Sequence, residues 1–346
     1  MPILKVLKLE QFRNFKHFEL EFAPGLNYIV GANGSGKTSI LEAIHFLAYG
    51  KSFRSKELNR MIHQGDKSFT LFTAGTEGET PFKIGLKRSG PESTNRLNGE
   101  HVKTLSEFAE VLPLLLIHPE SFQLLTGGAK LRRQLIDWGV FYHYQAARTH
   151  FAMIRKCLRQ RNQSLKQHAS REQARLWETT CYEACEALNQ LRQQYVTLLA
   201  KQTQLLLGNF VETHHLNFEY AQGWPEGETL SEAWERSFLQ DLRSGHTEYG
   251  PHQADLKITS HKKPTRDVLS RGQQKTLVCT LKLAQGLLFE DLTQCKPLYL
   301  FDDLASELDK THRQKLIHTI LEQNCQVILT GIEKDRLFKA QHFVML

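Results

Sequence analysis

A glycine-rich segment near the N-terminus contains residue types that bind phosphate. Its residues are Gly31, Ala32, Asn33, Gly34, Ser35, Gly36, Lys37, Thr38 and Ser39. The spacing fits Gly-x-x-x-x-Gly-Lys-Ser/Thr, in which glycines let successive backbone N–H groups point into one concavity. Apolar residues 26–30 precede it, and apolar residues at helical spacing follow it, which is the strand-to-helix context that such a loop needs. We predict a nucleotide-binding loop in which Lys37 reaches the β- and γ-phosphates and Thr38 is a Mg²⁺ ligand.

Two adjacent acids follow a second apolar segment much later in the chain. Residues 298–301 are apolar, and Asp302 and Asp303 come directly after them. In a protein with a phosphate loop, a buried strand that ends in acids holds the metal ion and the attacking water. We predict that Asp302 binds Mg²⁺, mostly through water, and that Asp303 is the general base. Together with Lys37 they form the predicted catalytic set.

A second anion site is predicted shortly before these acids. Its residues, Ser270, Arg271, Gly272 and Gln273, stand at the start of a predicted helix, where anions bind favourably. One nucleotide does not need two phosphate sites in one small domain. We therefore predict that this segment covers the γ-phosphate of a nucleotide bound by a second copy of the chain. A polar turn at residues 306–309 suits the same interface and adds Asp309 to the predicted nucleotide-binding residues.

Three regions of different texture must position these segments. Residues 1–130 and 246–346 mix strand-like and helix-like patterns with turns. Residues from 131 to about 210 are almost free of Pro and rich in good helix formers, and residues 169–171 are predicted to divide them into two antiparallel helices. The simplest arrangement is one α/β domain built from residues 1–130 and 246–346, with residues 131–245 inserted as a helical arm.

The chain is basic, with a formal net charge of +7. Residues 130–175 hold eleven Lys or Arg and only two acids. Neutralisation of phosphates provides most sequence-independent affinity for nucleic acid, so an anionic partner is favoured. A solvated helical face is the alternative interpretation of this basic stretch, and the sequence leaves both open. The candidate DNA contacts are Lys51, Arg54, Lys56, Arg132 and Arg133.

The composition also indicates where the chain works. No apolar stretch approaches the roughly 20 residues that cross a bilayer, and the N-terminus lacks the pattern of a signal peptide. The six cysteines show no metal-binding spacing. We expect a cytoplasmic protein without a membrane partner.

The order of these motifs resembles that of ABC-type ATPase heads and, more narrowly, that of the RecF family of bacterial recombination mediators. The matching stretches cover nearly the whole chain: 12–15, 31–44, 50–54, 119–120, 132–138, 160–162, 249–256, 269–275, 283–286 and 302–309. The resemblance implies an α/β fold, an ABC-type P-loop head with an inserted, mainly helical second lobe. It implies ATP and Mg²⁺ as cofactors, an ATP-induced homodimer on DNA at gaps or single-strand/duplex junctions, and slow, DNA-stimulated hydrolysis. It further implies a role in recombinational repair and replication-fork maintenance, in which RecR and RecO are partners and RecA is loaded.

Two positions depart from the general ABC pattern, and a third assignment is open. Most ABC ATPases carry Asp-Glu at the end of the acidic strand, whereas this chain has Asp-Asp, as the RecF family does, which is consistent with a slow switch. Thr330 stands near the place of the usual switch histidine, and Gln123 is one candidate for the glutamine between the lobes. Two alternatives stay open: an ATP-gated DNA clamp with incidental hydrolysis, and the nucleotide-binding subunit of a transporter.

Overall fold

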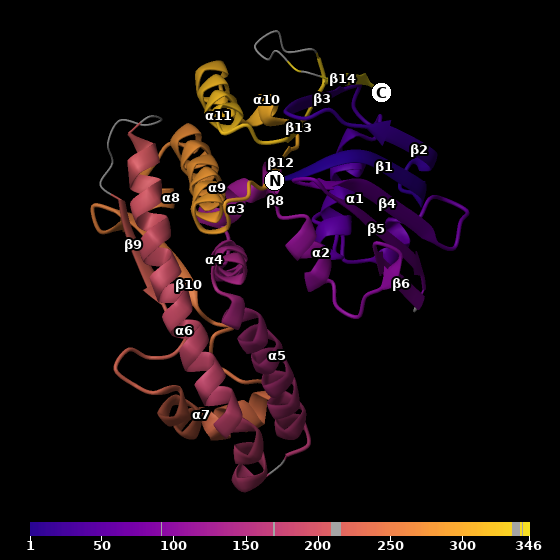
Figure 1. Ribbon diagram of the computed structural model, residues 1–346. Helices are drawn as coiled ribbons and strands as arrows, with labels where there is room; N and C mark the ends of the chain where they lie inside the picture. The colour runs from indigo at the N-terminus through magenta and orange to yellow at the C-terminus, as the bar shows by residue number, and fades with distance from the viewer. Residues whose placement is uncertain (91, 169, 209–215, 334–339, 341) are drawn as a thin grey trace. The chain divides into compact units, whose positions relative to one another are not determined.

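The structure, a computed structural model, describes residues 1–90, 92–168, 170–208, 216–333, 340 and 342–346 (Figure 1). The chain divides into two compact units, and each contains segments that are distant in sequence. Unit 1 comprises Met1–Phe122 and Lys275–Leu346, and unit 2 comprises Gln123–Gln274.

A parallel sheet forms one half of unit 1. Its strands, in spatial order, are β14 (His342–Met345), β3 (Leu26–Val30), β13 (Val327–Gly331), β12 (Leu298–Phe301) and β8 (Leu114–Ile117). Every residue of β3, β8, β12 and β13 is buried, as is typical of parallel strands covered on both faces. Because β3 pairs with β13 and β14, the N-terminal and C-terminal regions of the chain share one sheet. The predicted α/β head is thus confirmed, and the carboxyl ends of β3, β12 and β13 meet at one edge.

An antiparallel sheet forms the other half of unit 1. Its strands are β2 (Phe15–Glu21), β1 (Pro2–Phe12), β4 (Phe69–Glu77), β5 (Thr80–Ser89), β6 (Glu92–Leu97) and β7 (Glu100–His101). Asn98 and Gly99 both have positive φ, which the tight turn between β6 and β7 requires. The buried amide of Gln326 accepts from the backbone N–H of Leu4 and donates to its carbonyl oxygen, both at 2.8 Å. This side chain therefore joins β1 to the start of β13.

Helices complete the core of unit 1. They are α1 (Lys37–Tyr49), α2 (Ser106–Val111), α10 (Leu304–Glu307), α11 (Lys310–Glu322) and most of α9 (Arg271–Thr293), with single turns η1 (Leu58–Arg60) and η2 (Pro119–Phe122). Apolar side chains of α1 pack in one cluster with both sheets. Helix α9 packs closely on β12 because Gly286 has no side chain: a Cβ there would lie 1.8 Å from the hydroxyl of Tyr299.

Unit 2 is mainly helical. Its helices are α3 (Gln123–Thr126), α4 (Ala129–His143), α5 (Gln145–Lys166), α6 (Arg171–Leu207), α7 (Leu230–Ser244) and α8 (Thr265–Val268), and a small sheet has the order β11 (Lys263–Pro264), β10 (Asp255–Ser260), β9 (Leu216–Ala221). Helices α5 and α6 lie side by side (Figure 1). None of the helices in the described ranges is both long and apolar enough to span a bilayer.

The structure differs from two sequence-based expectations about this unit. A break at Tyr144, whose φ of −129° and ψ of 109° are extended, divides the expected first helix into α4 and α5. The break expected at 169–171 falls between the end of α5 at Lys166 and the start of α6, whose N-cap is Ser170. Residue 169 itself lies outside the described residues. The sequence predicts that residues 246–274 belong to the head, whereas the structure places them in unit 2, where β10 pairs along its whole length with β9.

Candidate nucleotide-binding site

The glycine-rich loop needs its glycines. Gly34 and Gly36 have φ of +84° and +106°, which other residues rarely adopt. A Cβ on Gly36 would also lie 2.4 Å from the ring of Phe15. Helix α1 begins immediately after this turn at Lys37, and its first turn contains no acid. The positive end of the helix dipole is therefore available to a phosphate.

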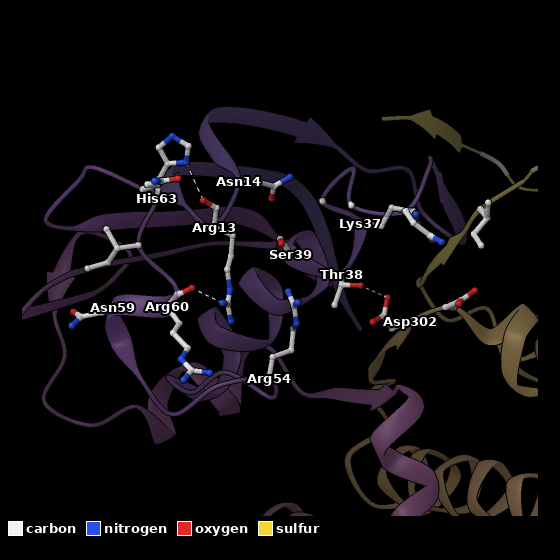
Figure 2. A pocket seen from close by; sticks show the side chains of 17 residues that line it. Arg13, Asn14, Lys37, Thr38, Ser39, Arg54, Asn59, Arg60, His63 and Asp302 are labelled. Carbon is white, nitrogen blue, oxygen red and sulfur yellow. Dashed lines mark hydrogen bonds between the residues drawn. The ribbon is translucent and has the colours of Figure 1, made fainter.

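The loop borders a pocket of about 840 Å³. Figure 2 shows its lining, which comes from the loop, the turn after β1, the segment around η1, and the ends of β12 and β13: Arg13, Asn14, Asn33, Gly34, Gly36, Lys37, Thr38, Ser39, Arg54, Asn59, Arg60, Ile62, His63, Gln64, Asp302, Asp303 and Ile332. This volume suits a ligand of nucleotide size. The Lys37 ammonium donates to the carbonyl oxygens of Gly31 and Ala32, at 2.6 and 2.8 Å, which leaves one N–H of the ammonium for a ligand.

The acidic strand end meets the loop inside this pocket. Thr38 Oγ1 donates to Asp302 Oδ1 at 3.0 Å, although the two residues are 264 positions apart (Figure 2). Burial raises the pKa of Asp302, and hydrogen bonds from Thr330 and Thr38 lower it in part. A hydroxyl and a carboxylate at this separation are the oxygen donors that Mg²⁺ takes in phosphate-loop sites.

Thr330 connects the two acids. Its hydroxyl donates to Asp302 Oδ1 at 2.9 Å and accepts the backbone N–H of Asp303 at 3.0 Å. Asp303 itself has a φ of +50° and a ψ of 48°, a left-handed conformation that costs energy for a residue other than glycine. This strained backbone turns the Asp303 side chain into the pocket lining, and the Thr330 hydroxyl helps to hold it there. The sequence indicated only that Thr330 stands where a histidine is usual.

A buried carboxylate beside the pocket escaped the sequence-based assignment of roles. Glu42 on α1 is fully buried and receives Arg13 Nε at 2.8 Å and Nη2 at 2.5 Å, Arg54 Nη1 at 3.5 Å, and the hydroxyl of Ser52. Arg13 also donates to the carbonyl oxygen of Arg60 (Figure 2). We call Glu42, Arg13, Arg54 and Ser52 the Glu42 cluster. The sequence feature that could have indicated this buried carboxylate is the position of Glu42 between apolar residues of a predicted helix.

The predicted second anion site lies at the start of α9. Ser270, Arg271 and Gly272 are exposed there. Ser270 and Gln273 cap the helix: Ser270 N–H donates to Gln273 Oε1 at 2.8 Å, and Gln273 N–H donates to Ser270 Oγ at 3.2 Å. Asp309 is likewise an N-cap, accepting the N–H of His312 at 3.0 Å. These side chains thus have structural partners within the chain, and the exposed helix start remains accessible.

The predicted DNA contacts fall into two groups. Lys51, Arg54 and Lys56 are exposed, but Arg54 lines the pocket and belongs to the Glu42 cluster. Arg132 forms a bidentate pair with Asp255, at 2.7 and 3.0 Å, and donates to two backbone carbonyl oxygens. Arg133 donates to the carbonyl oxygen of Ala254 at 2.7 Å. Sequence reasoning missed these internal partners because all of them except the Arg132 carbonyl contacts are more than 100 positions away.

Comparison with known proteins places the chain in a family. The family model described as RecF/RecN/SMC N terminal domain matches residues 3–346. A DNA replication and repair protein RecF from Shewanella halifaxensis (strain HAW-EB4) is 42% identical over 328 residues, covering 94% of this chain and 90% of the relative. The RecF of Shewanella baltica (strain OS185) is 41% identical over 338 residues, covering 97% and 94%. The chain belongs to the RecF family. This membership sets aside the transporter subunit as an alternative.

Solved structures of RecF and of SMC heads share the fold of this RecF-family chain. The recombination mediator protein RecF-ATPrS in the RecFOR pathway has a TM-score of 0.89 at 24% identity, with 100% of this chain and 96% of that one covered. An Smc head domain from Pyrococcus furiosus, with an extended coiled coil and bound to the C-terminal domain of ScpA, has a TM-score of 0.56 at 17% identity, covering 96% and 90%. The ABC-type head predicted from the motif order is confirmed.

Proposed function

We propose that this chain is an ATP-dependent DNA-binding protein that hydrolyses ATP slowly and uses the hydrolysis as a switch. The carrying observation is the 3.0 Å hydrogen bond between Thr38 and Asp302, which joins the phosphate loop to the acidic strand end in one pocket. RecF relatives are named for DNA replication and repair, and a solved RecF structure is described as bound to ATP. The residues present fit a nucleotide and a magnesium ion.

Each pocket residue has a distinct task in this proposal. The N–H groups of the loop and the Lys37 ammonium bind phosphate oxygens, while Thr38 and Asp302 hold Mg²⁺. Bound ATP supplies the phosphoanhydride, and Mg²⁺ neutralises its charge. Asp303 accepts the proton of the attacking water. Its short side chain and strained backbone are consistent with slow turnover.

The site is completed by a second copy of the chain. The exposed start of α9, with Ser270, Arg271 and Gly272, offers the positive end of its helix dipole and the Arg271 cation to the γ-phosphate held by its partner. Dimerisation then depends on bound ATP, and hydrolysis releases the two copies. We propose that the closed dimer holds DNA without reading its sequence, at gaps or junctions, and that it works with RecO and RecR to assist RecA loading.

Asp303→Asn tests the switch. We predict that turnover falls by about 10²- to 10⁴-fold, because the general base is lost. ATP binding remains, and the ATP-bound dimer persists longer on gapped duplex DNA. Steady-state phosphate release and size-exclusion chromatography with light scattering measure the two effects, and exposed Asp291→Asn is the matched control.

Two results would change the proposal. If Asp303→Asn hydrolyses ATP as fast as the parent, Asp303 is not the base. If the parent releases no phosphate above background but binds DNA only with ATP, the clamp with incidental hydrolysis replaces the switch.

A further inference from the structure

Helix α5 carries a large excess of positive charge. It contains six Lys or Arg residues and no acid. Helix α6, which lies beside it, contains four of each sign. Six of the eleven cations in the basic stretch 130–175 therefore lie on α5, and the other five lie on α4 and α6.

Four of these six cations lie on one exposed face. At 3.6 residues per turn they fall within about 100° of arc around the helix axis. The same arc also holds Gln145, Ala152 and Gln163, which are exposed and uncharged, and Arg148, which is half-buried with its guanidinium over the ring of Phe141. In the part of the chain that the structure describes, no carboxylate lies within ion-pair distance of the four. We call this set the arm stripe: Arg155, Lys156, Arg159 and Lys166.

A buried cation on the same helix, Arg161, is paired with acids of unit 2 and stabilises its fold. Arg161 is 1% exposed, and it donates to Glu178 at 2.9 Å and to Asp241 at 2.7 Å. Its guanidinium also lies over the ring of Trp234. Among the residues that the structure describes, the arm stripe has no such carboxylate partner. Arg155 and Arg159, one turn apart, repel each other, which destabilises an isolated helix by a few tenths of a kcal/mol.

We propose that the arm stripe binds the phosphate backbone of duplex DNA, an inference that rests on the proposed DNA-binding function and assigns it a surface. From Arg155 to Lys166 the stripe is about 16 Å long, which matches about five phosphates of one strand. Lys and Arg contacts to phosphate carry no sequence information. The stripe has no aromatic side chain on which bases stack, which favours the duplex over single-stranded DNA.

The test compares two variants of equal charge. In the arm variant, Arg155, Lys156, Arg159 and Lys166 are all changed to Gln, which keeps helix propensity. In the control, four exposed lysines of unit 1 are changed to Gln: Lys5, Lys83, Lys87 and Lys103. Binding to a fluorescent 30-base-pair duplex is measured by anisotropy over a series of salt concentrations with a non-hydrolysable ATP analogue, and analogue binding itself checks that each variant is folded.

We expect the arm variant to lose about 100-fold in affinity at low salt and its salt slope to fall by about 3 to 4, because about 0.9 counterions are released per phosphate contact. The control variant should keep most of the parent's affinity and most of its salt slope. If the arm variant binds duplex as the parent does, the stripe assignment is overturned while the proposed function stands. If the parent binds no DNA, both fail. Equal losses of duplex affinity in the two variants would also overturn the assignment. Binding to a fluorescent poly-glutamate peptide is measured in the same way. If the arm variant loses affinity only for that peptide, the stripe binds an acidic protein partner and not DNA.

Discussion

In unit 1 the guanidinium groups of Arg13 and Arg54 lie against the buried carboxylate of Glu42. In unit 2 the cations of the arm stripe face solvent, and no carboxylate of the described residues lies within ion-pair distance of them. A buried acid fixes the position of a cation and shields it from salt. An exposed cation stays mobile and releases counterions when it meets a polyanion. The head therefore uses arginine to shape a small pocket, and the proposed role of the arm stripe is to meet an extended row of phosphates.

Removing the Glu42 carboxylate should destabilise unit 1 far more than removing a cation of the arm stripe destabilises unit 2. Glu42→Gln leaves two arginines beside a neutral buried amide, and we expect a loss of about 3 to 5 kcal/mol in the free energy of unfolding. Arg159→Gln on the arm should change it by less than about 0.5 kcal/mol. Hydrogen exchange on peptides from residues 37–60 reports on unit 1. All four tryptophans lie in unit 2, so their fluorescence reports on the arm. Equal effects of the two variants would contradict the comparison.

The interior of α1 should also respond to pH. His45 packs against Tyr49 and Phe53, and burial lowers its pKa from 6.5 to about 3. The folded state then binds fewer protons than the unfolded chain, so the stabilisation is complete above pH 6.5 and is lost as the pH falls toward 3. We expect a loss of about 2 kcal/mol at pH 5.

Urea unfolding followed by circular dichroism at pH 7 and pH 5 measures this loss. His45→Gln, which cannot take up a proton, is the control and should flatten the pH dependence. A parent protein with the same stability at both pH values would show that His45 is not held neutral.

A smaller effect is expected where a hydroxyl, rather than a charge, positions a group. Thr330→Val keeps the shape but removes the bonds to Asp302 and to the backbone of Asp303. We expect kcat for ATP to fall about tenfold, by about 1.4 kcal/mol in activation free energy, with little change in KM. Thr330→Ser should restore the rate. A purely structural role would lower stability in Thr330→Val without this selective loss of kcat.

Local patterns made much of the head predictable from the sequence. The phosphate loop, the strand at 298–301 and its terminal acids are contiguous motifs, so their residues could be named without a structure. The contacts that position them are not local. Thr330 reaches Asp302 across 28 positions, and Arg13 reaches Glu42 across 29.

The misplaced segment has the same cause. Residues 255–260 look like a strand of the head by composition, and only their pairing with residues 216–221 assigns them to unit 2. Arg132 is a second example. From the sequence it is indistinguishable from an exposed surface cation, because its ion-pair partner Asp255 is distant in the chain.

The central claim is that two copies share each nucleotide site, and mixing two inactive variants tests it most directly. Lys37→Ala removes the loop lysine, and Ser270→Arg obstructs the start of α9. Each variant alone should hydrolyse almost no ATP. In a 1:1 mixture about half of the dimers contain one intact site, so we predict recovery of about a quarter of the parent's specific activity. A mixture no more active than its two components, or a fully active Ser270→Arg variant, would show that each chain completes its own site.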